Sequence, residues 1–198
     1  MRKNMDASPK IVAVYEAVHR LICDGQDVSQ LIVADIARDA GIGKGTIYEY
    51  FESKEEIIAR ALFYELDLIM TETMNVLSRA ATVEDCFMLL AGMMDEGSSL
   101  GTFFELGKKL VSDAPDVART MQGGGRACEL CQKYIDQLVD VFWDKLEKEG
   151  CIMEGTDRDY IHFLILGMLQ MVMFPGYAPE KRQQMVEYSM RTIKKALG

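Results

Sequence analysis

The stretch that most constrains the fold of this chain is residues 36–54, which read IARDAGIGKGTIYEYFESK. It predicts two short helices joined by a tight turn, because Gly41 can adopt the left-handed backbone conformation that ends the first helix. In the second helix, over 44–51, Ile47 and Phe51 are four residues apart and predict an inward face. A helix of about two turns is not stable alone, so its neighbours must hold it.

The outward face of this second helix carries groups that suit contact with DNA. A short, supported helix with polar, aromatic and basic side chains outward is typical of the helix-turn-helix reader that enters a major groove. Lysine reaches phosphates or guanine edges, glycine permits close backbone approach, and hydroxyl groups bond the DNA backbone. The alternative, in which Tyr48 packs internally and Lys44 is merely solvated, stays open. The predicted DNA-binding residues are Lys44, Gly45, Thr46, Tyr48, Tyr50 and Lys54.

This stretch resembles the tetracycline-repressor (TetR) family of bacterial transcription regulators. The resemblance is residue-level over roughly positions 8 to 66, and beyond them it lies only in length and helical layout. It implies three N-terminal DNA-binding helices, a long fourth helix, and an all-α domain that binds a small ligand and dimerises. It also implies that most of the residues predicted above occupy positions that commonly touch DNA. The matching residues are Val33, Ile36, Ala37, Ala40, Gly41, Lys44, Gly45, Thr46, Ile47, Tyr48, Tyr50, Phe51, Ser53 and Lys54.

One position departs from the family pattern. Many relatives place Thr or Ser as the cap of the second helix, four residues before the Ile36-Ala37 pair, and this chain has Ile32 there. Ser29 is the alternative cap, in a slightly longer loop.

Composition and charge narrow the class of protein. The chain has 198 residues, 49% hydrophobic and 27% charged, as in ordinary globular proteins. A net charge of −9 argues against indiscriminate nucleic-acid binding. Residues 1–60 carry 8 Lys and Arg against 10 Asp and Glu, so most of the acidic excess belongs to the rest. Because the N-terminus has no apolar leader and the run 160–174 is too short to span a bilayer, we expect a cytoplasmic protein without a membrane partner.

Periodicity and capping residues predict an all-α chain in two domains. Residues 1–53 form the helix-turn-helix DNA-binding domain, and a long fourth helix joins it to a helical ligand-binding and dimerisation domain, 54–198. The predicted caps are Ser8, Ser53, Thr82 with Asp85, and Thr156 or Asp157. The predicted helices cover about 9–23, 31–40, 44–51, 53–81, 82–95, 103–111, 115–149 with a break at 123–125, 160–174 and 179–197.

The last two predicted helices indicate a symmetric interface. The run 160–174 is apolar on nearly every side and must be covered on both faces. Val186, Met190, Ile193 and Leu197 follow at the spacing of one helical stripe. Two such helices from each subunit would make a four-helix bundle, so we expect a homodimer. The alternative, that 160–174 is simply the central core helix, stays open.

Methionine is abundant in the predicted second domain. Flexible, polarisable side chains suit a pocket that adapts to apolar ligands, although each can equally fill a gap in the core. The predicted ligand-binding residues are Met70, Met74, Met93, Phe104, Met121, Tyr134, Phe142, Met168 and Met171.

Cysteine and histidine carry weaker signals. Cys128 and Cys131 form a C-x-x-C with no second pair at zinc-site spacing, which favours two small buried residues over a redox or metal pair. Cys23 carries no signal, and His19 and His162 are expected to be satisfied core residues. Neither a phosphate loop nor a nucleophile elbow is present, so we expect no enzyme, cofactor or metal.

Together these patterns predict a homodimeric repressor that binds a palindromic operator and is released by an apolar small-molecule ligand. The alternative keeps the helix-turn-helix but assigns the C-terminal domain to a protein partner, or to redox sensing through Cys128 and Cys131.

Overall fold

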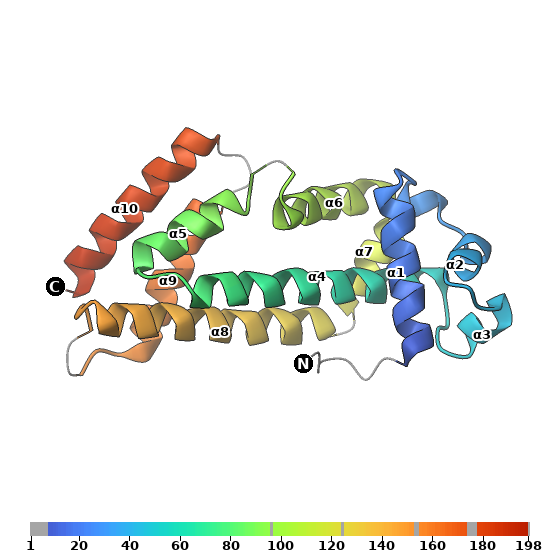
Figure 1. The fold of residues 1–198 in the computed structure, drawn as a ribbon, viewed down its shortest axis with the longest axis horizontal. Helices are drawn as coiled ribbons and strands as arrows, with labels where there is room; N and C mark the ends of the chain where they lie inside the picture. Colours follow the sequence, from blue (N-terminus) through green and yellow to red (C-terminus); the bar gives the residue numbers. More distant parts are fainter. Residues whose placement is uncertain (1–7, 96, 124, 153–154, 174–177, 198) are drawn as a thin grey trace. The chain divides into compact units, whose positions relative to one another are not determined.

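The computed structural model describes the chain except for residues 1–7, 96, 124, 153–154, 174–177 and 198. The described residues form helices and no strand, which confirms the all-α prediction (Figure 1). A short 3-10 helix, Val28–Gln30, lies between the first two α-helices. The α-helices are α1 (Pro9–Cys23), α2 (Val33–Asp39), α3 (Lys44–Tyr48), α4 (Lys54–Ser78), α5 (Val83–Gly92), α6 (Ser99–Asp113), α7 (Pro115–Gly123), α8 (Arg126–Lys148), α9 (Arg158–Val172) and α10 (Pro179–Leu197).

The chain forms two compact units. The N-terminal unit comprises Met1–Leu68 with Leu106–Glu129, and the C-terminal unit comprises Ile69–Glu105 with Leu130–Gly198. Helices α4, α6 and α8 each run from one unit into the other. The two compact units therefore differ from the two domains predicted from the sequence, whose boundary follows residue 53. The division into functional domains 1–53 and 54–198 stays a prediction.

The core of the N-terminal unit is built around α1. Its inward stripe includes Val14, Tyr15 and Val18, all buried. The Tyr15 ring meets the Phe51 ring edge-on at 6.0 Å between centroids and lies 5.4 Å from Tyr64. Residues from the end of the helix-turn-helix and from α4 therefore close over the same face of α1.

Two predicted caps at the start of the chain are wrong. Ser8 precedes α1, but its side chain makes no capping hydrogen bond, and Pro9 at the first helical position starts the helix by its fixed φ. Ser29 lies inside the 3-10 helix and does not cap α2. Ile32 is the residue before α2, in an extended conformation with no side-chain cap. The Lys54 ammonium instead binds the Ser29 carbonyl at 3.2 Å.

Other helix starts confirm the capping predictions. The Ser53 hydroxyl accepts from the Glu56 amide at 3.1 Å at the start of α4. Thr82 and Asp85 form a reciprocal capping box on α5, and the Asp157 carboxylate accepts from the Asp159 amide at the start of α9. The predicted glycine break falls between α7 and α8, where Gly125 has φ +66°.

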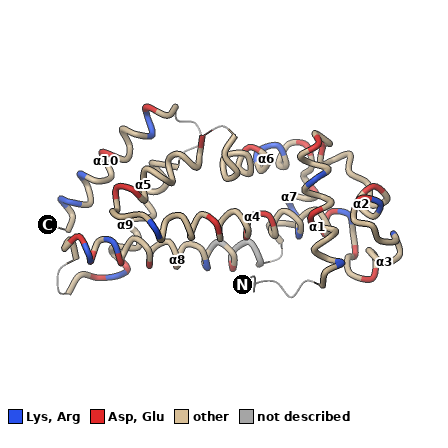
Figure 2. Tube along the Cα trace, in the orientation of Figure 1, with Lys and Arg blue, Asp and Glu red and all other residues tan. Residues whose placement is uncertain are grey.

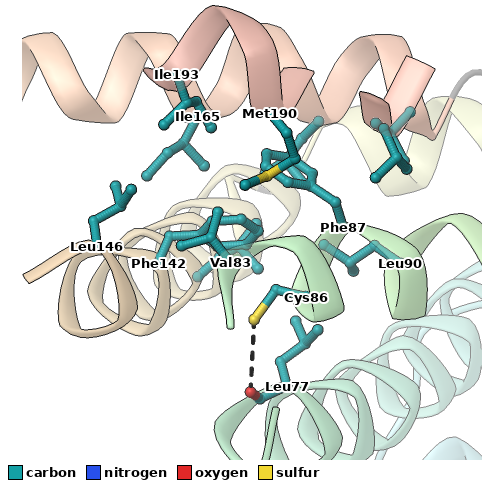
Figure 3. Packing of buried hydrophobic residues seen from close by; sticks show 14 of the residues in the cluster. Leu77, Val83, Cys86, Phe87, Leu90, Phe142, Leu146, Ile165, Met190 and Ile193 are labelled. Atoms are coloured by element: carbon teal, nitrogen blue, oxygen red, sulfur yellow. Dashed lines mark hydrogen bonds between the residues drawn. The ribbon is translucent and has the colours of Figure 1, made fainter. Parts of the chain in front are cut away.

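The core of the C-terminal unit lies among α5, α8, α9 and α10 (Figure 3). Phe87 of α5 packs edge-on against Phe142 of α8 at 4.8 Å. The Cys86 thiol points to the Leu77 carbonyl at 3.8 Å, and burial raises the pKa of this thiol to about 11. The predicted α10 stripe of Val186, Met190, Ile193 and Leu197 is buried in this core.

Helix α8 stabilises the junction between α4 and α5. The buried Lys145 ammonium donates to the Ser78 carbonyl at 3.1 Å and to the Ala80 carbonyl, groups that the end of α4 leaves without helical partners. One turn later, Glu149 accepts from the Val83 amide at 2.6 Å. Helix α8 thus supplies a cation to the C-terminal end of α4, and the residue directly after α8 supplies an anion to the N-terminal end of α5, as the helix dipoles favour.

Within the described ranges, none of the helices has both the length and the apolar character needed to cross a membrane.

Candidate nucleic-acid interface

The turn before α3 has the backbone geometry that the sequence predicts. Gly41 has φ +67°, a value that side-chain-bearing residues rarely adopt. The Ile42 amide then bonds the Ala37 carbonyl at 3.1 Å and closes the end of α2. Gly43 is extended and precedes the first residue of α3. The turn therefore fixes the direction in which α3 leaves α2.

Helix α3 is held by one side chain. It has five residues, shorter than the predicted 44–51, and Ile47 is its buried residue, with no exposed surface. Phe51, beyond its end, is also buried. A helix this short depends on such an anchor, because nucleation in isolation is unfavourable.

The opposite face of α3 is open. Lys44 and Gly45 are exposed, and Tyr48 is 51% exposed, so the alternative that Tyr48 packs internally is wrong. Glu49, directly after the helix, is exposed as well. The accessible surface is therefore one cation, a glycine backbone and a phenol beside one acid.

The remaining predicted DNA-binding residues are less accessible. Thr46 and Tyr50 are half-buried. Lys54 is half-buried too, and its bond to Ser29 connects the start of α4 to the 3-10 helix. Lys54 thus has a structural role in addition to the predicted phosphate contact.

Two groups that sequence reasoning missed support the α3–α4 turn. The Arg60 guanidinium lies over the Phe51 ring at 4.9 Å, bonds the Tyr50 carbonyl at 3.3 Å, and pairs with Glu56 at 3.2 Å. The spacing of Glu56 and Arg60, four residues apart, was the available signal. In the same unit, Arg20 of α1 pairs with Asp39 of α2 at 2.8 Å. These contacts stabilise the α3–α4 turn and the packing of α1 against α2, and none of them involves the exposed face of α3.

The charge around this face is mixed. Figure 2 shows acidic as well as basic residues along the helices of the N-terminal unit. Arg38, largely exposed, is paired with Asp35 at 2.7 Å. A surface of this kind gives weak non-specific attraction to phosphates, so specificity must come from a few good contacts.

The predicted ligand-binding residues fall into separate environments. Met121 belongs to the N-terminal unit and the others to the C-terminal unit. Phe142 is core, Tyr134 is buried with its hydroxyl 3.0 Å from that of Thr71, and Phe104 and Met171 are exposed. The half-buried ones are Met70, Met74, Met93, Met121 and Met168. The structure does not bring all nine together, and their ligand role stays a prediction.

A cavity of about 150 Å³ lies elsewhere, in the N-terminal unit. None of the nine predicted ligand-binding residues lines it. Its walls come from the end of α1 with the following loop and from α6–α7, namely Ile22, Gly25, Gln26, Asp27, Val28, Leu106, Lys109, Leu110, Asp113 and Ala114.

The prediction for His19 is wrong. Its ring is about half exposed, with Nδ1 3.3 Å from a Glu65 carboxylate oxygen and Nε2 3.4 Å from the Cys23 sulfur. His162 is half-buried beside the Phe163 ring. The side chains of Cys128 and Cys131 lie outside the described residues. Among the side chains that are described, no three His, Cys, Asp or Glu residues are grouped to hold a metal ion.

The fold and the open face of α3 define an all-helical protein with a helix-turn-helix. Residues 26–61 match the model of the bacterial regulatory proteins of the tetR family. These residues, which span the helix-turn-helix and the start of α4, are similar to this family of transcription regulators.

Individual proteins are similar to this chain in part of the sequence or in fold. The HTH-type transcriptional regulator SAR0097 of Staphylococcus aureus is 29% identical over 77 residues, which cover 39% of this chain and 40% of that protein. A putative TetR-family regulator from Mesorhizobium loti superposes over 98% of this chain and 100% of its own, with a TM-score of 0.61 and 18% identity. FadR from Bacillus subtilis, in complex with stearoyl-CoA, covers 94% of this chain and 96% of its own, with a TM-score of 0.51 and 18% identity. The two structures show a shared fold.

Proposed function

We propose that this chain is a TetR-family regulator, a homodimeric repressor that reads a palindromic operator with α3 of each subunit and is released by an apolar small molecule. The observation that carries the proposal is the division of α3 into a buried anchor, Ile47, and an open face of Lys44, Gly45 and Tyr48. A short helix fixed from behind and open in front suits the major groove.

Each exposed group has a role in this proposal. Lys44, at the first turn of α3, reaches a phosphate or a guanine edge. Gly45 lets the helix backbone approach the DNA closely, and the Tyr48 hydroxyl bonds the sugar-phosphate backbone. Glu49 repels phosphates, so it faces a cytosine amino group or solvent.

The surface of α9 supports the dimer. One side of the helix, including Ile161, Ile165 and Leu169, is buried in the subunit's own core. On the other side Tyr160 is exposed and Phe163 is 73% exposed. An aromatic side chain with so much apolar surface in water is favourably buried by a second subunit. In this proposal α9 packs in the subunit core with one side and contacts the second subunit with the other. Both interpretations of residues 160–174, as a core helix and as an interface helix, then apply.

The proposed ligand is apolar and enters the C-terminal unit. The structure of FadR from Bacillus subtilis is a complex with stearoyl-CoA. Here the half-buried methionines Met74, Met93 and Met168 pack against the core, and Met70 lies on α4. Methionine side chains can repack around an acyl chain. The protein has one conformer that fits the operator and one that does not. The ligand releases DNA if it binds the second conformer more tightly than the first. We place this regulation in the cytoplasm.

The first test is selection of bound duplexes from a random pool, followed by affinity against salt concentration. We expect a palindromic consensus. Lys44→Ala should weaken binding and lower the salt slope by about one. Lys148→Ala is the matched control, since Lys148 is an exposed lysine of the C-terminal unit and should bind as the unmodified protein does. If the selection enriches no sequence, the proposal that α3 reads DNA is refuted and a protein partner for the C-terminal domain is favoured.

The ligand arm uses stearoyl-CoA as its probe, with and without the selected operator. Linkage requires that DNA weaken ligand binding by the same factor by which ligand weakens DNA binding. Equal ligand affinity for free and DNA-bound protein would refute the release mechanism.

A further inference from the structure

The cavity of about 150 Å³ in the N-terminal unit is used neither by the helix-turn-helix nor by the proposed apolar ligand. One wall comes from the segment 22–28, where α1 ends and the loop leads to the 3-10 helix, and the other comes from residues 106–114 of α6–α7. Both walls belong to the same compact unit. The C-terminal ends of α1 and α6 lie side by side there (Figure 1).

The buried part of the cavity lining is apolar. Val28, Leu110 and Ala114 are buried, and Ile22 and Leu106 are half-buried. An apolar cavity of about this volume is large enough to bind benzene. The space therefore fits the compact body of a small molecule and is too small for an acyl chain.

The exposed part of the lining carries the charge. Its charged residues are Asp27, Lys109 and Asp113, so one lysine against two aspartates gives a net charge of −1. Lys109 and Asp113 are four residues apart on α6, and their charges offset each other. Asp27 comes from the opposite wall, and its carboxylate makes no capping hydrogen bond with the 3-10 helix that it precedes. The rim thus offers a carboxylate to a cation.

The helix ends at the cavity favour the same sign of ligand. The C-terminal end of a helix carries a partial negative charge, and both α1 and α6 end at this place. The last turn of α6 has no basic residue, and Arg20, in the last turn of α1, is paired with Asp39 of α2. The N-terminal end of α7 has the opposite sign and carries Asp116 in its first turn. The two negative ends therefore add to the attraction of Asp27 for a cation.

We propose that this cavity binds small primary ammonium ions with a compact apolar body. The apolar body occupies the space among Val28, Leu110 and Ala114, and the ammonium lies at the rim and donates hydrogen bonds to Asp27 and Asp113. An ammonium has three donors and no acceptor, which matches a rim of carboxylates. A neutral molecule of the same shape gains only the apolar contact, and an anion is repelled by the two carboxylates.

The test is methyl NMR of the full chain, labelled at the Ile, Leu and Val methyl groups and titrated with benzylamine. Ile22, Val28, Leu106 and Leu110 place labels in the cavity lining. We expect saturable shifts of these methyl resonances with a Kd of about 1 mM, as suits a ligand of this size. Benzyl alcohol should bind about tenfold more weakly, because it lacks the attraction to both carboxylates, and benzoate should bind more weakly still.

Asp27→Asn should weaken benzylamine binding about threefold and leave benzyl alcohol binding unchanged, because one of two exposed carboxylates loses its charge. Asp24→Asn is the matched control, since Asp24 is an exposed acid of the same segment that does not line the cavity. It should bind both probes as the unmodified protein does. Leu106→Trp should abolish binding of both probes, because the larger side chain fills the apolar space and leaves the charges intact. The methyl spectrum of each variant shows whether it is folded.

Equal affinities for benzylamine and benzyl alcohol, tighter binding of benzoate, or an equal loss in Asp24→Asn and Asp27→Asn would overturn the ammonium assignment. The site itself is refuted if the four lining residues show no methyl shifts, or if folded Leu106→Trp still binds benzylamine. The readout needs neither an operator nor an acyl ligand, so its failure is distinct from failure of DNA binding or of ligand-induced release.

Discussion

Ile47 carries the most consequential prediction, because it is the buried residue that fixes α3. Its side chain has no exposed surface, and the Tyr50 and Phe51 amides bond its carbonyl at 3.0 Å. Ile47→Ala removes most of a buried aliphatic side chain and should cost about 2–5 kcal/mol, against about 0.5–1.5 kcal/mol for Ile47→Val. Since the anchor is local, the loss should appear first as opening of α3. At about 1.4 kcal/mol per factor of ten, a cost of about 3 kcal/mol corresponds to roughly hundredfold more frequent opening.

Hydrogen exchange followed by mass spectrometry over residues 43–51 measures this opening. We expect about hundredfold faster exchange in Ile47→Ala and a few-fold change in Ile47→Val. Tyr48→Ala is the control, since that exposed side chain should affect DNA binding without accelerating exchange. If Ile47→Ala leaves exchange and operator affinity unchanged, α3 is held by something other than this anchor and the reasoning fails.

Three further predictions concern the rest of the chain. Lys145→Met should lower the unfolding free energy by about 1.5–3 kcal/mol, because it leaves the carbonyls at the end of α4 without a charged donor; thermal unfolding beside the exposed Lys148→Met control checks this. Gly101→Ala should destabilise the α5–α6 corner, because the added carbon would lie 2.7 Å from the Asp95 carbonyl; proteolysis of that segment would reveal it. The pKa of Cys86 rises from 9.0 to about 11 on burial, so its contribution to stability is present below pH 9 and is lost as the pH rises towards 11; denaturant unfolding of Cys86→Ala should show a shallower decline over that window.

Local chemistry made much of the fold predictable from the sequence. The capping bonds of Ser53 and of Thr82 with Asp85 join groups three residues apart, so they depend only on the neighbouring turn. The left-handed Gly41 and the inward face at Ile47 were likewise readable from residue type and helical period. Capping could not be predicted in this way at the start of α2. Extended Ile32 precedes the helix, and Ser29 lies in the 3-10 helix, where its carbonyl accepts from Lys54, 25 residues away.

The sequence by itself determined the all-α class, the helix-turn-helix and its resemblance to the tetR family, because these follow from spacings within one or two turns. Tertiary structure alone decided which distant groups meet. Glu65 reaches His19 from another helix, Lys145 caps a helix that ends 67 residues earlier, and Leu106–Glu129 packs with the N-terminal unit. Such contacts depend on how whole helices pack and on which side chains the packing brings within bonding distance, and helical period carries no information about that.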